Sequence, residues 1–187
     1  MSRGSYHHGD LKAVIIAEAA TLVAERGADG ISLRELARAA GVSHAAPAHH
    51  FTDRRGLFTA LAAEGWRLLA SSLAEAASPE FVDAAMAYVR FALDHPGHYE
   101  VMFDRSLVNP DDTDLIAAQA AAGAELSAGV GTLADPRAKA DPDSAALAAW
   151  SLVHGFAMLW LNGAIRDDAD PIATVERVAK MLYDRGR

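Results

Sequence analysis

The residues whose types and spacing best suit chemistry lie in one short predicted helix near 44–51. His44 and His49 offer hydrogen-bonding rings, and Ala45 and Ala46 offer methyl groups. Polar side chains and small apolar ones are the groups that contact base edges in the major groove of DNA. This pattern favours reading of a nucleic acid, with a merely solvated helix as the alternative.

Two short helices must position these side chains. Ser32 and Glu35 have the spacing of a capping box, which predicts a helix over 32–40. That helix should stop at Gly41, because a residue without Cβ can take the left-handed conformation that ends a helix. The second helix begins only three residues later, with Ser43 as its expected N-cap. So short a link fixes the angle between the helices, and the pair is predicted to be a helix-turn-helix.

Positive side chains follow this helix pair. Arg54 and Arg55 start the next predicted helix directly behind Asp53, where guanidinium groups and free backbone N–H groups could meet a phosphate. Surface solubility is the alternative role for both. The complete set of candidate DNA contacts is Ser32, Arg34, Ser43, His44, Ala45, Ala46, His49, Thr52, Arg54 and Arg55.

The charge is unevenly distributed along the 187 residues, although the formal net charge is −8. Residues 1–67 carry eight Arg and Lys against seven Asp and Glu, whereas residues 68–187 carry nine against eighteen. A polyanion would be repelled by the second part and tolerated by the first. Any contact with DNA is therefore expected at the N-terminus.

The composition predicts an all-α fold. Ala and Leu together number 61 and Val and Ile only 17, a bias toward strong helix formers. Proline after a capping residue marks several helix starts. Helices are predicted near 10–26, 32–40, 44–51, 54–77, 79–94, 96–105, 113–128, 142–166 and 171–185, with loops over 106–112 and 129–139.

Several classes of protein are disfavoured. The chain has no cysteine, which excludes disulfides, cysteine-ligated metals and thiol nucleophiles. The adjacent pairs His7-His8 and His49-His50 would point about 100° apart on a helix, so no metal site is expected. No phosphate loop, nucleophile elbow or paired-carboxylate spacing predicts an enzyme or a cofactor. No stretch is expected to reach the roughly 20 uncharged apolar residues of a membrane span, which favours a cytoplasmic protein.

Many spaced features of the first third resemble the TetR-type (tetracycline repressor-like) transcriptional regulators. The resemblance is carried by Tyr6-His7-His8-Gly9-Asp10-Leu11, Ala24-Glu25-Arg26-Gly27, Ser32-Leu33-Arg34-Glu35-Leu36-Ala37, Gly41-Val42-Ser43, His50-Phe51, and Asp53-Arg54 to Leu57. Further on, Trp150-Ser151-Leu152-Val153-His154-Gly155 is similar to the Trp…His-Gly segment of one C-terminal domain type of that family.

The resemblance implies a three-helix DNA-binding domain over 1–53 and a helical domain for ligand binding and dimerisation over 54–187. It further implies a homodimer on a pseudo-palindromic operator in double-stranded DNA, and a repressor released by a small-molecule effector. Two residues depart from the family pattern: Ala48 stands where a phosphate-contacting Tyr is usual, and Pro47 lies inside the recognition helix. An all-helical small-molecule binding protein with weakened or lost DNA binding is therefore the alternative.

Aromatic and polar side chains of the second part are candidates for the effector site. They are Tyr88, Phe91, Tyr99, Met102, Phe103, Trp150 and His154. Their helical spacing is equally typical of plain core, and a hydrogen-bonded core histidine is the default interpretation of His154. As a pocket, they favour an uncharged or weakly anionic, partly aromatic ligand.

The last two predicted helices carry more apolar surface than a small domain needs. The stripes are Leu152, Phe156, Leu159, Trp160 and Gly163 on the first, and Ile172, Val175, Val178, Ala179 and Leu182 on the second. Pairing with the same helices of a second copy would cover both, and Gly163 is expected to allow close approach.

Overall fold

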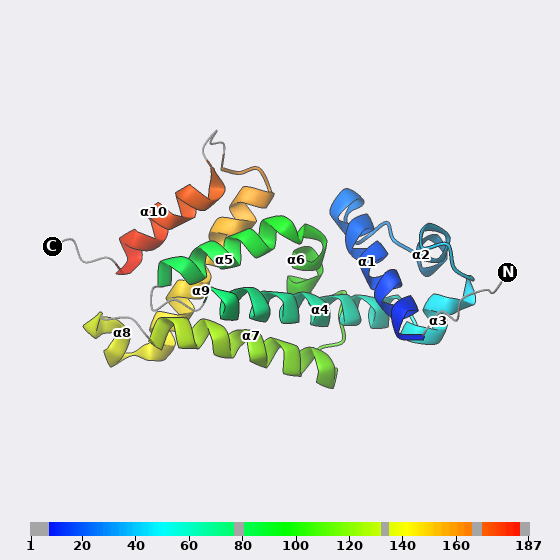
Figure 1. Cartoon of the computed structure of the whole chain (residues 1–187), viewed down its shortest axis with the longest axis horizontal. Coiled ribbons are helices and arrows are strands. Elements are labelled where there is room, and N and C mark those ends of the chain that lie inside the picture. The colour runs from blue at the N-terminus through cyan, green and yellow to red at the C-terminus, as the bar shows by residue number, and fades with distance from the viewer. Residues whose placement is uncertain (1–7, 77–80, 132–134, 166–169, 184–187) are drawn as a thin grey trace. The chain divides into compact units, whose positions relative to one another are not determined.

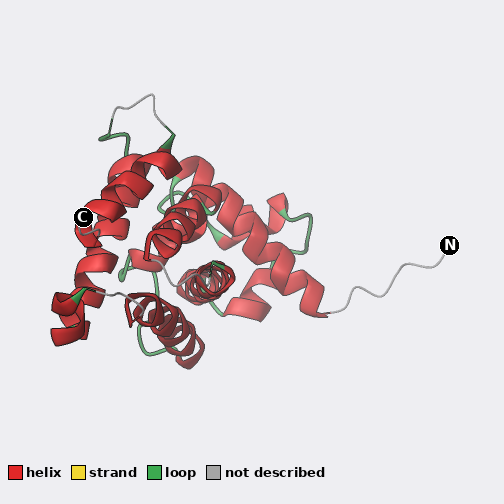
Figure 2. Cartoon of the chain, turned by 60° about the vertical axis from the view of Figure 1, so that its left-hand side comes forward, coloured by secondary structure: helices red, strands yellow, loops and turns green. Residues whose placement is uncertain are grey.

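The protein is helical throughout the part of the chain that the structure describes. The computed structural model describes residues 8–76, 81–131, 135–165 and 170–183, and within these it has ten α-helices and no strand (Figure 2). The predicted all-α class is therefore confirmed. Each predicted helix is present, with ends that differ by a few residues.

The contacts divide the chain into two compact units, and the helices are labelled in Figure 1. Unit 1, residues 1–65 and 95–117, holds α1 (His8–Arg26), α2 (Leu33–Ala39), α3 (Ala45–Phe51), the first half of α4 (Arg54–Glu75), α6 (Pro96–Phe103) and the start of α7 (Thr113–Gly131). Unit 2, residues 66–94 and 118–187, holds the remainder of α4 and α7 with α5 (Phe81–Asp94), α8 (Pro136–Ala140), α9 (Pro142–Leu161) and α10 (Pro171–Tyr183).

Unit 1 is built on α1, which packs against α2, α3 and α6. Ile15, Ala19 and Val23 recur at helical spacing on α1 and are buried. The approach of α6 to α1 is so close that a Cβ added to Gly97 would lie 2.0 Å from the carbonyl oxygen of Ala20. A glycine is required there, since any side chain would force the two helices apart.

Unit 2 is centred on α5, which packs against both α9 and α10. Tyr88 of α5 and Val153 of α9 are buried, as are Val175 and Ala179 of α10. The stripe expected on α10 for a second copy is thus partly used within its own unit. Phe156 of α9 is buried as well.

The prediction of a loop over 129–139 is wrong. Helix α7 continues to Gly131, and α8 follows over Pro136–Ala140. The carboxylate of Asp135 caps α8 by accepting the backbone N–H of Arg137 at 2.8 Å. A five-residue helix is too short to show an apolar stripe, so only this cap and Pro136 at the first position could have predicted it.

Gly163 lies beyond the end of α9, contrary to expectation. Its φ is +66°, and its N–H donates to the carbonyl of Trp160 at 2.9 Å. A glycine in this left-handed conformation terminates a helix. Gly163 therefore ends α9 and does not lie within its apolar stripe.

The expectation that no stretch is long and apolar enough to span a membrane fails at α9, because this helix is long and apolar enough to do so. Its sequence is uncharged from Ser144 onward, and interspersed Ala, Ser and Gly residues conceal the run. Length and composition alone are weak evidence for a span, since the core helix of a soluble protein passes the same test.

Candidate DNA-binding site

Helix α2 begins with the predicted cap. Ser32 has extended backbone angles, and its Oγ accepts the N–H of Glu35 at 3.2 Å. Ile31 and Leu36, which flank the cap at the spacing of a hydrophobic staple, are both buried. The direction in which the chain enters α2 is therefore fixed by both polar and apolar contacts.

The turn between α2 and α3 is a Schellman motif. Gly41 has φ +65°, its N–H donates to the Arg38 carbonyl at 3.2 Å, and the N–H of Val42 donates to the Ala37 carbonyl at 2.9 Å. This confirms the expected helix stop at Gly41. The two bonds leave the link between the helices little freedom, as a helix-turn-helix requires.

The start of α3 differs from expectation. Ser43 is not the N-cap: the helix begins at Ala45 behind His44, and within the described residues no side-chain hydrogen bond caps it. His44 already has helical backbone angles. The first hydrogen bond at this helix start is therefore made by the Ser43 carbonyl, which accepts the N–H of Ala46 at 3.0 Å.

Pro47 does not break α3. It is the third residue of the helix, where a backbone N–H would have no partner inside the helix. Its ring is buried, as is that of Phe51 one turn later. Proline here packs the inner face of the helix at no cost in hydrogen bonds.

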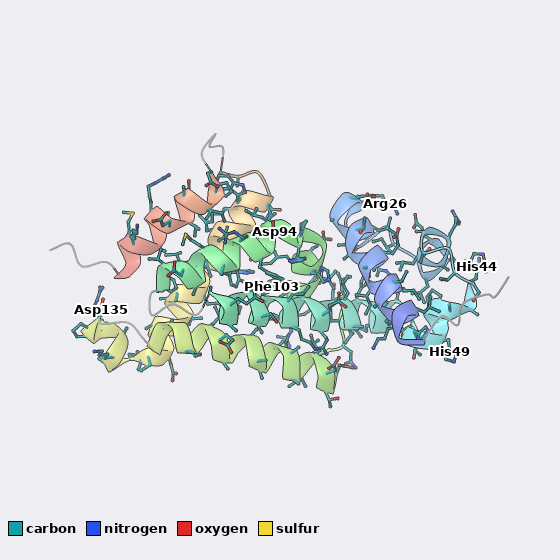
Figure 3. The ribbon with its side chains drawn as sticks, in the orientation of Figure 1. Arg26, His44, His49, Asp94, Phe103 and Asp135 are labelled. Carbon is teal, nitrogen blue, oxygen red and sulfur yellow. The ribbon has the colours of Figure 1, made fainter. Side chains whose placement is uncertain are left out.

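The opposite side of α3 is open. Ser43, His44, Ala45 and His49 are exposed, and Ala46 is half-buried. Figure 3 shows His44 and His49 at the outer edge of unit 1. The helix thus presents imidazole, hydroxyl and methyl groups of the kinds that read base edges.

A strained turn joins α3 to α4. Thr52 has φ +64° and ψ −56°, and the N–H of Asp53 donates to the Phe51 carbonyl at 2.7 Å, which defines a γ-turn of the rare positive-φ type. A β-branched residue is unusual in this conformation, so no sequence signal predicts it. A Cβ at Gly56 would lie 2.0 Å from the Phe51 carbonyl oxygen, which makes this glycine obligatory.

The two arginines at the start of α4 differ in their surroundings. Arg54 is half-buried, and its Nε and Nη2 donate to the carbonyls of Ile31 and Ala28 at 3.0 and 2.7 Å. Arg55 is exposed, and its Nη2 donates to the Ser106 carbonyl at the longer distance of 3.4 Å.

An ion pair ties α1 to α2. Arg26 Nη1 donates to Glu35 Oε1 at 2.8 Å. This hydrogen bond, with a smaller contribution from the backbone N–H of Ser32, holds the pKa of the Glu35 carboxyl below its ordinary value. Arg34 and Arg38 lie exposed on the same helix.

Four of the seven ligand candidates lie in unit 2, and three of them meet. The indole N–H of Trp150 donates to the Tyr88 hydroxyl at 3.4 Å, and that hydroxyl lies 3.2 Å from His154 Nδ1. Tyr88 and Phe91 are buried in α5, and burial lowers the pKa of His154. The result is an aromatic cluster with one hydrogen-bonded chain through it.

The other three lie on α6 in unit 1. The rings of Tyr99 and Phe103 meet edge to face with centroids 5.0 Å apart, and Tyr99 and Met102 are buried. Helix α4 passes so close that a Cβ at Gly65 would lie 2.6 Å from the Met102 sulfur. Helix α6 also carries Glu100, which contacts the backbone of Ala28 and which the sequence did not indicate as a functional residue.

Unit 1 has a buried core, and a rigid turn in it leads into a second helix with one exposed side. This arrangement is the helix-turn-helix of DNA-binding proteins. Family models agree with this class. Residues 15–61 match the bacterial regulatory proteins of the tetR family, and residues 81–182 match the tetracyclin repressor-like C-terminal domain. The chain belongs to the TetR family and is a transcriptional regulator.

Solved structures give the same fold. A Rhodococcus sp. RHA1 protein of unknown function is 34% identical over 97% of both chains, with a TM-score of 0.77. A tetR-family regulatory protein from Rhodococcus RHA1 is 17% identical, covering 92% of this chain and 95% of its own, with a TM-score of 0.73. NalD of Pseudomonas aeruginosa, the secondary repressor of the MexAB-OprM efflux pump, is 21% identical over 94% of both chains, with a TM-score of 0.63. Among proteins of curated function, none matches this chain.

Proposed function

We propose that the protein is a homodimeric repressor that binds a pseudo-palindromic operator and is released from it by a small apolar or mixed ligand. One observation carries the DNA-binding part: a rigid Schellman turn presents the exposed N-cap residue His44, with Ala45 and His49 of α3, beside a helix whose other side is buried. NalD, which shares the fold, is by its name a repressor.

The exposed residues take separate roles in this proposal. His44 and His49 donate hydrogen bonds to base edges, and Ala45 and Ala46 contact thymine methyl groups. Ser32, Arg34, Ser43, Thr52 and Arg55 hold the phosphate backbone on either side. Residues 1–53 form the DNA-binding domain, and residues 54–187 bind the ligand and the second copy.

We place the ligand beside the chain of hydrogen bonds formed by Trp150, Tyr88 and His154. An aromatic surface with few polar groups suits an uncharged or weakly anionic, partly aromatic molecule. The structure of EbrR, named a multidrug binding protein, has the same fold and was obtained with imidazole. A ligand shifts DNA affinity only by its differential affinity for the two states, so weaker operator binding with ligand present is the required effect.

The second copy is expected to cover the open apolar side of α9. Leu147, Met158, Leu159 and Leu161 are exposed there, and Met181 is exposed on α10. A stable interface of this kind buries on the order of 2,000 Å² and is largely hydrophobic. The second copy would shield the apolar side of α9 from water, which is how a helix of this composition can occur in a cytoplasmic regulator.

A small-molecule binding protein without DNA binding is the second candidate. Helix α3 contains no Lys or Arg, and the exposed Ala48 stands where the family resemblance implies a phosphate-contacting Tyr. A gel shift with the DNA beside the protein's own gene separates the two candidates. A retarded band that vanishes with excess operator, and persists with excess scrambled duplex, supports the repressor.

A further inference from the structure

Arg54 holds the loop between α1 and α2. Its Nε donates to the Ile31 carbonyl at 3.0 Å and its Nη2 to the Ala28 carbonyl at 2.7 Å. The guanidinium carbon also lies 4.6 Å from the centre of the buried Phe58 ring. A planar guanidinium that makes two forked hydrogen bonds and stacks on a ring is confined to one orientation.

The same loop is held from α6. Glu100 Oε1 accepts the N–H of Ala28 at 2.8 Å. Ala28 therefore has both backbone groups bonded to charged side chains, its N–H to Glu100 and its carbonyl to Arg54. Hydrogen bonds with one ionised partner are roughly twice as strong as neutral ones, so this point of the loop is firmly fixed.

The fixed loop leads directly into α2. Ile31, whose carbonyl Arg54 binds, immediately precedes the N-cap Ser32, and its side chain is buried. Because the Schellman turn at Gly41 fixes α3 to α2, a constraint on the entry of α2 is also a constraint on the direction of α3.

We infer that Arg54 is a positioning residue for DNA binding: it orients the helix-turn-helix through the Ala28–Ile31 loop and does not act by neutralising a phosphate. The inference rests on the proposed function. It separates the two neighbouring arginines, since the exposed Arg55 keeps the phosphate role and the half-buried Arg54 acts through the loop.

The salt dependence of DNA binding separates the two roles. Each phosphate contact contributes about 0.9 to the slope of log affinity against log salt concentration. The probes are a duplex enriched from a random pool by the parent protein and a scrambled duplex of the same composition. The variants are Arg54→Lys and Arg54→Gln, with Arg55→Lys and Arg55→Gln as matched controls.

Arg54→Lys keeps the charge and loses the forked geometry. We expect both Arg54 variants to bind the enriched duplex about tenfold more weakly, because a charge-assisted hydrogen bond is lost. The salt slope should stay unchanged, because these variants lose no phosphate contact. Arg55→Gln should flatten the slope, and Arg55→Lys should retain it. Parental affinity in Arg54→Lys, or a flattened slope in Arg54→Gln, would overturn the inference.

Hydrogen exchange of the DNA-free protein tests the loop independently of DNA binding. Arg54→Gln should accelerate amide exchange in residues 27–36 and leave the peptides of α9 unchanged, whereas Arg55→Gln should change neither. Unaltered exchange in residues 27–36 contradicts the inference, and so does acceleration along the whole chain, which would make Arg54 a residue of general stability. If the parent binds no duplex, the proposed function fails. The exchange measurement still decides whether Arg54 holds the Ala28–Ile31 loop.

Discussion

The Tyr88 hydroxyl lies 3.2 Å from Nδ1 of His154, and burial lowers the pKa of that imidazole. The two residues come from α5 and α9, so the bond joins two helices of unit 2. The neutral ring can accept the phenolic proton at Nδ1, whereas the protonated ring cannot. The folded state therefore favours the neutral imidazole.

This preference predicts a pH dependence of stability. Because the folded pKa of His154 is below the unfolded value of about 6.5, the unfolded chain binds more protons as pH falls through that value. Stability should decrease from about pH 7.5 to about pH 5.5. Urea unfolding at several pH values should show a smaller decrease for His154→Gln than for the parent; identical profiles would show that protons bind elsewhere.

Removal of the Tyr88 hydroxyl should weaken the ligand response. In Tyr88→Phe, the ligand concentration that releases half of the operator should rise about tenfold, because a buried polar contact is lost. The ligand is the strongest hit from a screen of aromatic compounds. Tyr99→Phe is the matched control from α6, and both variants should bind the operator like the parent without ligand. A tenfold loss in Tyr99→Phe alone would place the pocket at α6.

The helix-turn-helix could be predicted from sequence because local signals define it. The Ser32–Glu35 cap and the Gly41 stop act within a few residues, and both are present. The hydrogen bonds of Arg54 to the Ala28–Ile31 loop and the contact of Glu100 with Ala28 join residues far apart in sequence, which no local pattern reveals. The ligand candidates, which come from α5, α6 and α9, were likewise divided between two units by packing.

Gly97 should tolerate no side chain. Gly97→Ala brings a methyl group against the Ala20 carbonyl, and we expect a loss of about 1–3 kcal/mol in the free energy of unfolding. Gly123 in α7 has open space around its missing Cβ, so Gly123→Ala should gain about 0.5–1 kcal/mol through helix propensity. Urea titration measures both, and equal effects would contradict the close approach of α6 to α1.

A charge on the open side of α9 should separate the two copies. Leu159 is 51% exposed, and Leu159→Glu would bury a carboxylate in the proposed interface. Ile116 on α7 is 49% exposed, so Ile116→Glu is a control of matched exposure. Sedimentation at micromolar concentration should show a folded monomer for Leu159→Glu and dimers for the control and parent. A parent that sediments as a monomer contradicts the homodimer.

The most direct test of the central claim is selection of duplexes from a random pool by the dimeric parent protein. Two recognition helices related by a two-fold axis should enrich a pseudo-palindrome with two half-sites. The His44→Ala, His49→Ala double variant should lose preference for it while retaining its fold. Absence of any enriched sequence, or an enriched sequence without two-fold symmetry, would contradict DNA reading by α3 in a dimeric repressor.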